Sequence, residues 1–193
     1  MPTISKDSEH ERQLIVRAAI NCFLKQGLPV TSMQDIVQES GLSSDVVYRH
    51  FPGKNDILRL LGAMNTATAT GALREMLKET PLPPVDEFVG RLAIFFEASV
   101  DNGDPVSVTP QGWGVALYDD EVNVIMSEVV EALRDAWIEV AARMVDEGRL
   151  PSDADPEDVG RTLFSLFLGF MLQSLLGDVK AAHVQRALHA ILR

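Results

Sequence analysis

The sequence contains a single cysteine, few basic residues and no long uninterrupted apolar run. Cys22 has no second cysteine to pair with, which excludes an internal disulfide. The most apolar stretch, residues 163–176, is interrupted by Ser165, Gly169 and Gln173, and it falls short of the roughly 20 residues that cross a bilayer. The N-terminus has no apolar signal-peptide core. These absences predict a cytoplasmic protein with no membrane partner.

Positive charge is scarce and unevenly distributed. The chain has 17 Lys and Arg against 28 Asp and Glu, a formal net charge of −11. Within residues 1–60 the bases and acids balance, so the net negative charge lies in residues 61–193. A polyanion such as DNA is therefore expected to meet the N-terminal region and to be repelled by the remainder. Overall acidity does not exclude a nucleic-acid partner.

Apolar residues recur at helical spacing along most of the chain, and no segment alternates like a strand for long. This pattern predicts an all-α fold of about nine helices. The segment 103–118 gives no clear pattern. We expect one helical domain in residues 1–52 and a second in residues 53–193. The readable helices are expected at residues 14–26, 33–40, 43–50, 54–79, 86–100, 120–147, 156–176 and 180–192.

Two short expected helices are joined by Gly41-Leu42-Ser43, which is the spacing of a helix-turn-helix. Ser43 suits the N-cap of the second of them, and Pro52 disfavours helical geometry just after it. When the apolar side of this helix packs inward, its other side is left to face a major groove. The groove-facing candidates are Ser44, Asp45, Val46, Tyr48 and Arg49.

The helix starts near Thr31-Ser32 and near Lys54 are candidates for phosphate contacts. A helix N-terminus offers amide donors to anions, and the hydroxyl and ammonium groups add further donors. Contacts of this kind position a protein on DNA without reading its sequence.

A resemblance to a known family strengthens this interpretation. The segments TSMxDI at residues 31–36, GLS at 41–43 and YRHFPGK at 48–54 together resemble the N-terminal domain of TetR-family transcriptional regulators. The segment AAIxCFLKQG at residues 18–27 is similar to the first helix of that domain. The resemblance implies a homodimer that binds a double-stranded DNA operator, usually as a repressor, and releases it when a small molecule enters the C-terminal domain. Residues 1–52 would then be the helix-turn-helix DNA-binding domain, and residues 53–193 the ligand-binding and dimerisation domain.

By position, the resemblance also implies roles for individual residues. Phosphates would be held by Thr31, Ser32, Tyr48, His50 and Lys54, and bases would be approached by Ser43, Ser44, Asp45, Val46 and Arg49.

Some of these residues have alternative interpretations. Asp45 places a carboxylate at the groove-facing start of its helix, where it can accept from cytosine N4 or help to cap the helix. Tyr48 is alternatively a core aromatic residue, and His50 a cap. Val37 and Ser40 stand where the family commonly has alanines.

Residues 162–176 are apolar on nearly every side, which predicts burial by the rest of the domain and by a second copy of the chain. The alternative is a core helix buried within one chain. The expected homodimer interface comprises Ser165, Phe167, Gly169, Phe170, Gln173, Val184, Leu188 and Ile191.

A small, largely apolar effector of unknown identity is expected in the C-terminal domain. The residues that line an apolar cavity or, equally, form plain core are Met64, Phe88, Phe95, Phe96, Trp113, Met126 and Phe167.

Sequence patterns give an enzyme little support. The acidic run at residues 153–158 lacks the glycine and the distant glutamate of a calcium loop, and His183 and His189 do not share a helix face. No nucleophile motif or glycine-rich phosphate loop is recognisable. We therefore expect no catalysis, no metal and no cofactor. The rival interpretations are a small-molecule-binding helical enzyme and a protein-interaction module whose helix-turn-helix is only structural.

Overall fold

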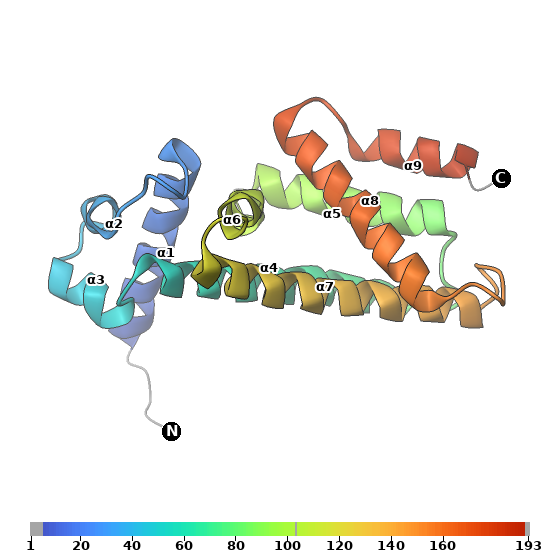
Figure 1. The fold of residues 1–193 in the computed structure, drawn as a ribbon, viewed down its shortest axis with the longest axis horizontal. Helices are drawn as coiled ribbons and strands as arrows, with labels where there is room; N and C mark the ends of the chain where they lie inside the picture. Colours follow the sequence, from blue (N-terminus) through green and yellow to red (C-terminus); the bar gives the residue numbers. More distant parts are fainter. Residues whose placement is uncertain (1–5, 103, 192–193) are drawn as a thin grey trace, which may run out of the picture. The chain divides into compact units, whose positions relative to one another are not determined.

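The computed structural model describes residues 6–102 and 104–191, and it confirms the all-α prediction. These residues form nine α-helices, one short 3-10 helix and no strand. Figure 1 shows the order of the helices along the chain. Their bounds are α1 Lys6–Gln26, α2 Met33–Ser40, α3 Ser44–His50, α4 Lys54–Met76, α5 Val85–Asp101, η1 Pro105–Val108, α6 Thr109–Ala116, α7 Asp120–Asp146, α8 Pro156–Leu176 and α9 Ala181–Ile191.

Two parts of this helix order differ from the expectation. Helix α1 begins at Lys6, whereas the sequence predicted a start at Leu14. The first two turns are polar, so no apolar periodicity revealed them. The segment without a readable pattern forms η1 and α6. Gly112 and Gly114 weaken the helical signal of α6, but a Cβ at Gly112 would lie 2.7 Å from the Met126 sulfur of α7. The glycine therefore permits the close approach of α6 to α7.

The chain divides into two compact units. The first ends at Met64 and also contains Ser107–Ser127, and the second contains Asn65–Val106 and the residues from Glu128 onward. Helices α4 and α7 each pass from one unit into the other. The first compact unit extends beyond the expected domain of residues 1–52, because it also contains α6 and the first turns of α4 and α7.

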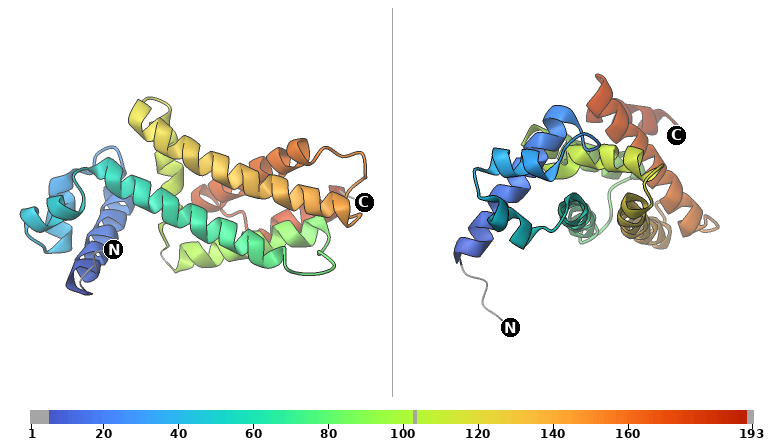
Figure 2. Two further views of the ribbon diagram at one scale, coloured as in Figure 1. Left: turned by 90° about the horizontal axis from the view of Figure 1, so that it is seen from below. Right: turned by 60° about the vertical axis from the view of Figure 1, so that its left-hand side comes forward.

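In the first unit, α2 and α3 pack against α1, as Figures 1 and 2 show from three sides. Ile15 and Phe23 of α1, Ile36 of α2 and Val47 of α3 are completely buried. Gly41 ends α2 with a φ of 68°, a left-handed conformation that glycine adopts without strain. These apolar contacts and the sharp turn fix the direction in which α3 points.

In the second unit, α9 lies alongside α5, and α8 also packs against α5 (Figure 1). The ring of Phe96 from α5 meets the rings of Phe167 and Phe170 from α8 edge to face, at centroid distances of 6.1 and 5.8 Å. Trp137 of α7 lies 5.7 Å from Phe167 and 6.5 Å from Phe88. Edge-to-face geometry of this kind adds to the stabilisation from burial.

Helix α8 is the one described helix that is long and apolar enough to cross a membrane by length and composition. Its buried residues, which include Leu163, Phe167, Phe170 and Met171, lie on one side of the helix. A Cβ at Gly160 would come within 2.6 Å of the Ile138 backbone, so α8 approaches α7 closely there. The helix therefore packs on the rest of its unit with one side and leaves the other side exposed in the single chain.

Candidate nucleic-acid interface

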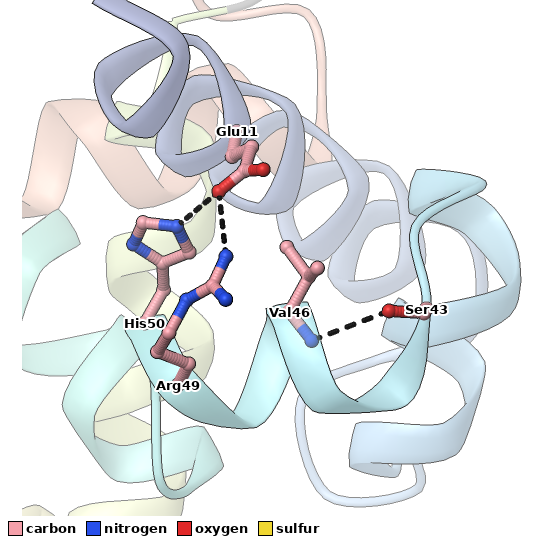
Figure 3. A network of polar contacts seen from close by, with 5 residues as sticks. All are labelled: Glu11, Ser43, Val46, Arg49 and His50. Carbon is pink, nitrogen blue, oxygen red and sulfur yellow. Dashed lines mark hydrogen bonds and ion pairs between the residues drawn. The ribbon is translucent and has the colours of Figure 1, made fainter. Parts of the chain in front are cut away.

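Helix α3 is anchored on one side and open on the other. The Ser43 hydroxyl caps it by accepting from the Val46 amide at 3.4 Å (Figure 3). Val47, the next residue, is completely buried. Because Val47 faces the core, the opposite side of the helix is accessible. The exposed residues of α3 are Ser44, Asp45, Tyr48 and Arg49, while Val46 is half-buried.

This arrangement bears on the alternatives for two residues of α3. Tyr48 is 44% exposed, so it is not a core aromatic residue. The N-cap contact comes from Ser43, and Asp45 lies exposed in the first turn, near the positive end of the helix dipole. Both side chains are therefore on the surface that the helix-turn-helix spacing predicts to face DNA.

A carboxylate from α1 reaches the end of α3. Oε2 of Glu11 accepts from a terminal nitrogen of Arg49 at 3.1 Å and lies 2.8 Å from Nε2 of His50 (Figure 3). Arg49 is 63% exposed at its side chain, whereas His50 is only 12% exposed. The hydrogen bond from His50, followed by that from Arg49, lowers the pKa of Glu11 despite partial burial.

Sequence reasoning missed Glu11. It lies 38 positions before Arg49, in the polar first turns of α1 where no helix was expected. No local pattern connects the two positions, and only the packing of α1 against α3 brings them together.

The start of α2 is a closed capping box. The Ser32 hydroxyl accepts from the Asp35 amide at 3.2 Å, and the Ser32 amide donates to the Asp35 carboxylate at 2.8 Å. Thr31 is only 2% exposed, and its hydroxyl donates to the Gly27 carbonyl at 2.8 Å. Ser32 is exposed, but its hydroxyl also donates to the Asp35 carboxylate at 2.7 Å. The Thr31 hydroxyl lies inside the domain and closes the turn between α1 and α2.

Lys54 at the start of α4 points into the same turn. Its ammonium donates to the carbonyls of Leu28 at 2.8 Å and Thr31 at 3.0 Å. Partial burial lowers the pKa of Lys54, and the nearby Asp119 carboxylate opposes this shift. Two of the lysine's donors are therefore directed at the backbone of its own unit.

A glutamine from α6 holds the other side of this turn. The Gln111 side chain accepts from the Leu28 amide at 2.7 Å and donates to the Phe23 carbonyl at 3.1 Å. The turn includes Gly27, whose φ of 92° is left-handed. Gln111 was not anticipated, because it lies in the segment that has no readable pattern.

Comparisons with known proteins agree with this geometry. Residues 15–61 match the family described as "Bacterial regulatory proteins, tetR family", and residues 91–193 match "BetI-type transcriptional repressor, C-terminal". The uncharacterized HTH-type transcriptional regulator YfiR of Bacillus subtilis is 36% identical over 192 residues, which cover 95% of this chain and 89% of YfiR. The chain belongs to the TetR family of transcriptional regulators.

Solved structures of low sequence identity have the same fold. Salmonella enterica GusR matches with a TM-score of 0.76 at 18% identity, covering 95% of both chains. Thermus thermophilus FadR, a TetR-family repressor solved in complex with lauroyl-CoA, matches with a TM-score of 0.62 at 22% identity, covering 94% of this chain and 92% of FadR.

The predicted effector residues of this TetR-family protein fall into both units. Phe88, Phe96 and Phe167 belong to the aromatic cluster of the second unit, while Phe95 is exposed on α5. Met64, Trp113 and Met126 belong to the first unit. Among the described residues, the indole Nε1 of Trp113 is buried without a hydrogen-bond partner.

The predicted dimer residues also divide into two groups. Phe167, Phe170 and Leu188 are buried within the chain itself, where they pack in the second unit. On the opposite side of α8 lie Ser165, Gly169 and Gln173. On α9, Val184 is half-buried and Ile191 is exposed.

The outer side of α8 also carries apolar residues that the list of expected interface residues omits. Leu172 is 45% exposed and Leu176 is 80% exposed. They share a face with Ser165 and Gly169, because residues four and seven apart lie on one side of a helix. The apolar run is nearly continuous, so its periodicity alone could not separate the inward from the outward leucines and phenylalanines.

Replacement of Lys54 by methionine tests what the ammonium does. Lys54→Met keeps the aliphatic stem but leaves the Leu28 and Thr31 carbonyls without a donor, so we expect the free energy of unfolding to fall by about 1–3 kcal/mol. Urea denaturation followed by circular dichroism measures this change, and Lys25→Met on the exposed side of α1 is the control.

An unchanged stability would contradict this role of Lys54. If duplex affinity then fell and its salt dependence flattened by about one unit of slope, Lys54 would instead make the phosphate contact that the family resemblance implies.

Proposed function

We propose that this TetR-family regulator is a cytoplasmic repressor. It binds a palindromic operator as a homodimer and leaves the operator when a small, largely apolar effector binds. The observation that carries the proposal is the surface of α3, whose buried Val47 directs Ser44, Asp45, Tyr48 and Arg49 outward. The match of residues 91–193 to a transcriptional-repressor family supports repression rather than activation of transcription.

Within this proposal, the residues of α3 read bases and the residues around it hold phosphates. Arg49 suits guanine, whose O6 and N7 accept from a guanidinium, and Asp45 suits the amino group of cytosine. Val46 offers a methyl contact to thymine. Ser32 and Tyr48 are the exposed residues among those expected at phosphates, and the Ser32 hydroxyl would exchange its hydrogen bond to Asp35 for one to a phosphate.

Three residues first expected at phosphates have contacts inside the first unit. Thr31 closes the turn between α1 and α2, Lys54 donates to backbone carbonyls, and His50 pairs with Glu11. We assign them the task of holding the reading helix in place. Ser43 combines its cap with an exposed position beside the bases.

Dimerisation is proposed through the outer side of α8 and through α9. Leu172, Leu176 and Ile191 leave apolar surface exposed in the single chain, and such surface is typical of protein–protein contacts. Small residues at Ser165 and Gly169 allow a second helix to approach closely. Two chains joined in this way form a four-helix interface and place two α3 helices for successive major grooves, about 34 Å apart.

Effector response is proposed to pass through α6. Trp113 has a buried indole N–H without a described acceptor, so a ligand oxygen would satisfy it. Two positions earlier, Gln111 holds the turn that carries α2 and α3. A ligand that moves α6 would therefore disturb the reading head directly. Since T. thermophilus FadR is solved with lauroyl-CoA, an acyl-CoA is a rational first probe.

Selection of bound sequences from a random duplex pool tests the function. We expect enrichment of an inverted repeat with half-site centres about one helical turn apart, and affinity that falls steeply with salt. Salt-sensitive binding without any enriched sequence would contradict specific regulation. Absence of duplex binding would favour the interaction module, and turnover of a small molecule from a metabolite panel would favour an enzyme.

The dimer proposal predicts that Leu172→Asp separates the chains. A carboxylate buried without a partner costs on the order of several kcal/mol, and a single reading head gains nothing from a palindrome. Sedimentation should give twice the 21.2 kDa chain mass for the wild type and the single mass for the variant. Leu117→Asp, at an exposed leucine outside α8 and α9, is the control. If the Leu172→Asp variant remains dimeric, α8 is not part of the dimer interface.

The effector proposal predicts different defects for two residues of α6. Gln111→Leu should retain effector affinity but reduce the coupling between effector and operator, normally about 1–3 kcal/mol. Trp113→Phe should weaken effector binding while leaving the turn contacts intact. Operator titrations with and without lauroyl-CoA and related apolar ligands measure both changes, and linkage requires equal coupling in each direction. If Gln111→Leu releases the operator as the wild type does, α6 does not transmit the signal.

A further inference from the structure

The end of α3 contains a three-residue polar network whose effect on Arg49 the proposed function leaves open. Oε2 of Glu11 accepts hydrogen bonds from Arg49 at 3.1 Å and from His50 at 2.8 Å (Figure 3). Glu11 comes from α1, whereas Arg49 and His50 are consecutive residues of α3. The network therefore joins the reading helix to the helix behind it.

His50 fixes the position of Glu11. A carboxylate only accepts hydrogen bonds, so Nε2 of the imidazole must carry the proton toward Oε2. With a side chain only 12% exposed, His50 is held by its surroundings and has little freedom to leave the contact. The Glu11 carboxylate therefore has a defined position when it accepts from Arg49.

Glu11 has two effects on Arg49. It removes much of the conformational freedom of a long, exposed side chain, and it leaves most of the guanidinium donors available. It also places a negative charge beside the positive charge that would attract any phosphate. Non-specific affinity for DNA depends mainly on such attraction, whereas base reading depends on the geometry of the donors.

We infer that Glu11 is a specificity-determining residue that orients Arg49 toward base edges and weakens its attraction to phosphates. Its carboxylate lowers binding to unrelated sequences more than binding to the operator. Glu11 acts through Arg49, so it is a positioning residue, and His50 positions it in turn. The inference rests on the proposed reading of DNA by α3.

The test compares affinities for the selected operator and for an unrelated duplex in the full-length chain. Glu11→Gln should raise affinity for the unrelated duplex about three- to tenfold at 100 mM salt and steepen its salt dependence by up to about one unit of slope per protomer. Operator affinity should change less, so the ratio of the two affinities should fall by a similar factor.

The control is Glu39→Gln, which removes the same charge from the same unit. Glu39 lies on α2 and accepts from Asn21 of α1 at 3.0 Å, but it does not bind the reading arginine. If net charge alone mattered, both variants would change the ratio equally, and that result would overturn the inference. In an Arg49→Ala background, Glu11→Gln should leave the ratio unchanged, because the residue through which it acts is gone.

Loss of stability does not obscure the result. Partial unfolding lowers the apparent affinities for both duplexes by the same factor and leaves their ratio intact. A wild type that discriminates, together with a Glu11→Gln variant that discriminates equally well, overturns the inference alone. If the wild-type protein prefers no DNA sequence, the proposed function on which this inference rests is wrong.

Discussion

The turn between α1 and α2 depends on donors and acceptors supplied by side chains from elsewhere in the chain. The carbonyls of Leu28 and Thr31 accept hydrogen bonds from the Lys54 ammonium, and the Leu28 amide donates to the Gln111 side chain. Backbone groups of a partly buried turn are costly when unpaired, so these contacts determine whether the turn keeps one conformation. The positions of α2 and α3 depend on that turn, because α2 begins directly after it.

An acidic protein that binds DNA must restrict attraction to one surface and also limit it there. The net charge of −11 lies outside residues 1–60, which confines the encounter to the helix-turn-helix. On that surface Glu11 pairs with Arg49, and hydrogen bonds from His50 and Arg49 lower the pKa of Glu11. Under our inference, the charge that weakens general attraction to DNA is the same charge that orients the Arg49 side chain.

The sequence predicted those parts of the protein that depend on local chemistry. Capping residues, the glycine of the turn and Pro52 were sufficient to locate α2 and α3, and the buried Val47 follows from helical spacing. The functions of Thr31 and Lys54 were harder to predict, because a hydroxyl or an ammonium at a helix start serves a phosphate or a backbone carbonyl equally well. Only the fold shows that both point inward.

Long-range contacts were beyond sequence reasoning for a different reason. Glu11 and Gln111 lie in segments whose local patterns are weak, a polar helix start and a helix with two internal glycines. Natural proteins depart from local rules most often where function imposes a second requirement. In α6 the departure is specific: Gly112 lets the helix approach Met126, and this approach accompanies the contact of Gln111 with the turn and the burial of the Trp113 indole N–H. A stronger helix former at Gly112 would improve local propensity and exclude that packing, so the weak helical signal of α6 is itself a consequence of its proposed role.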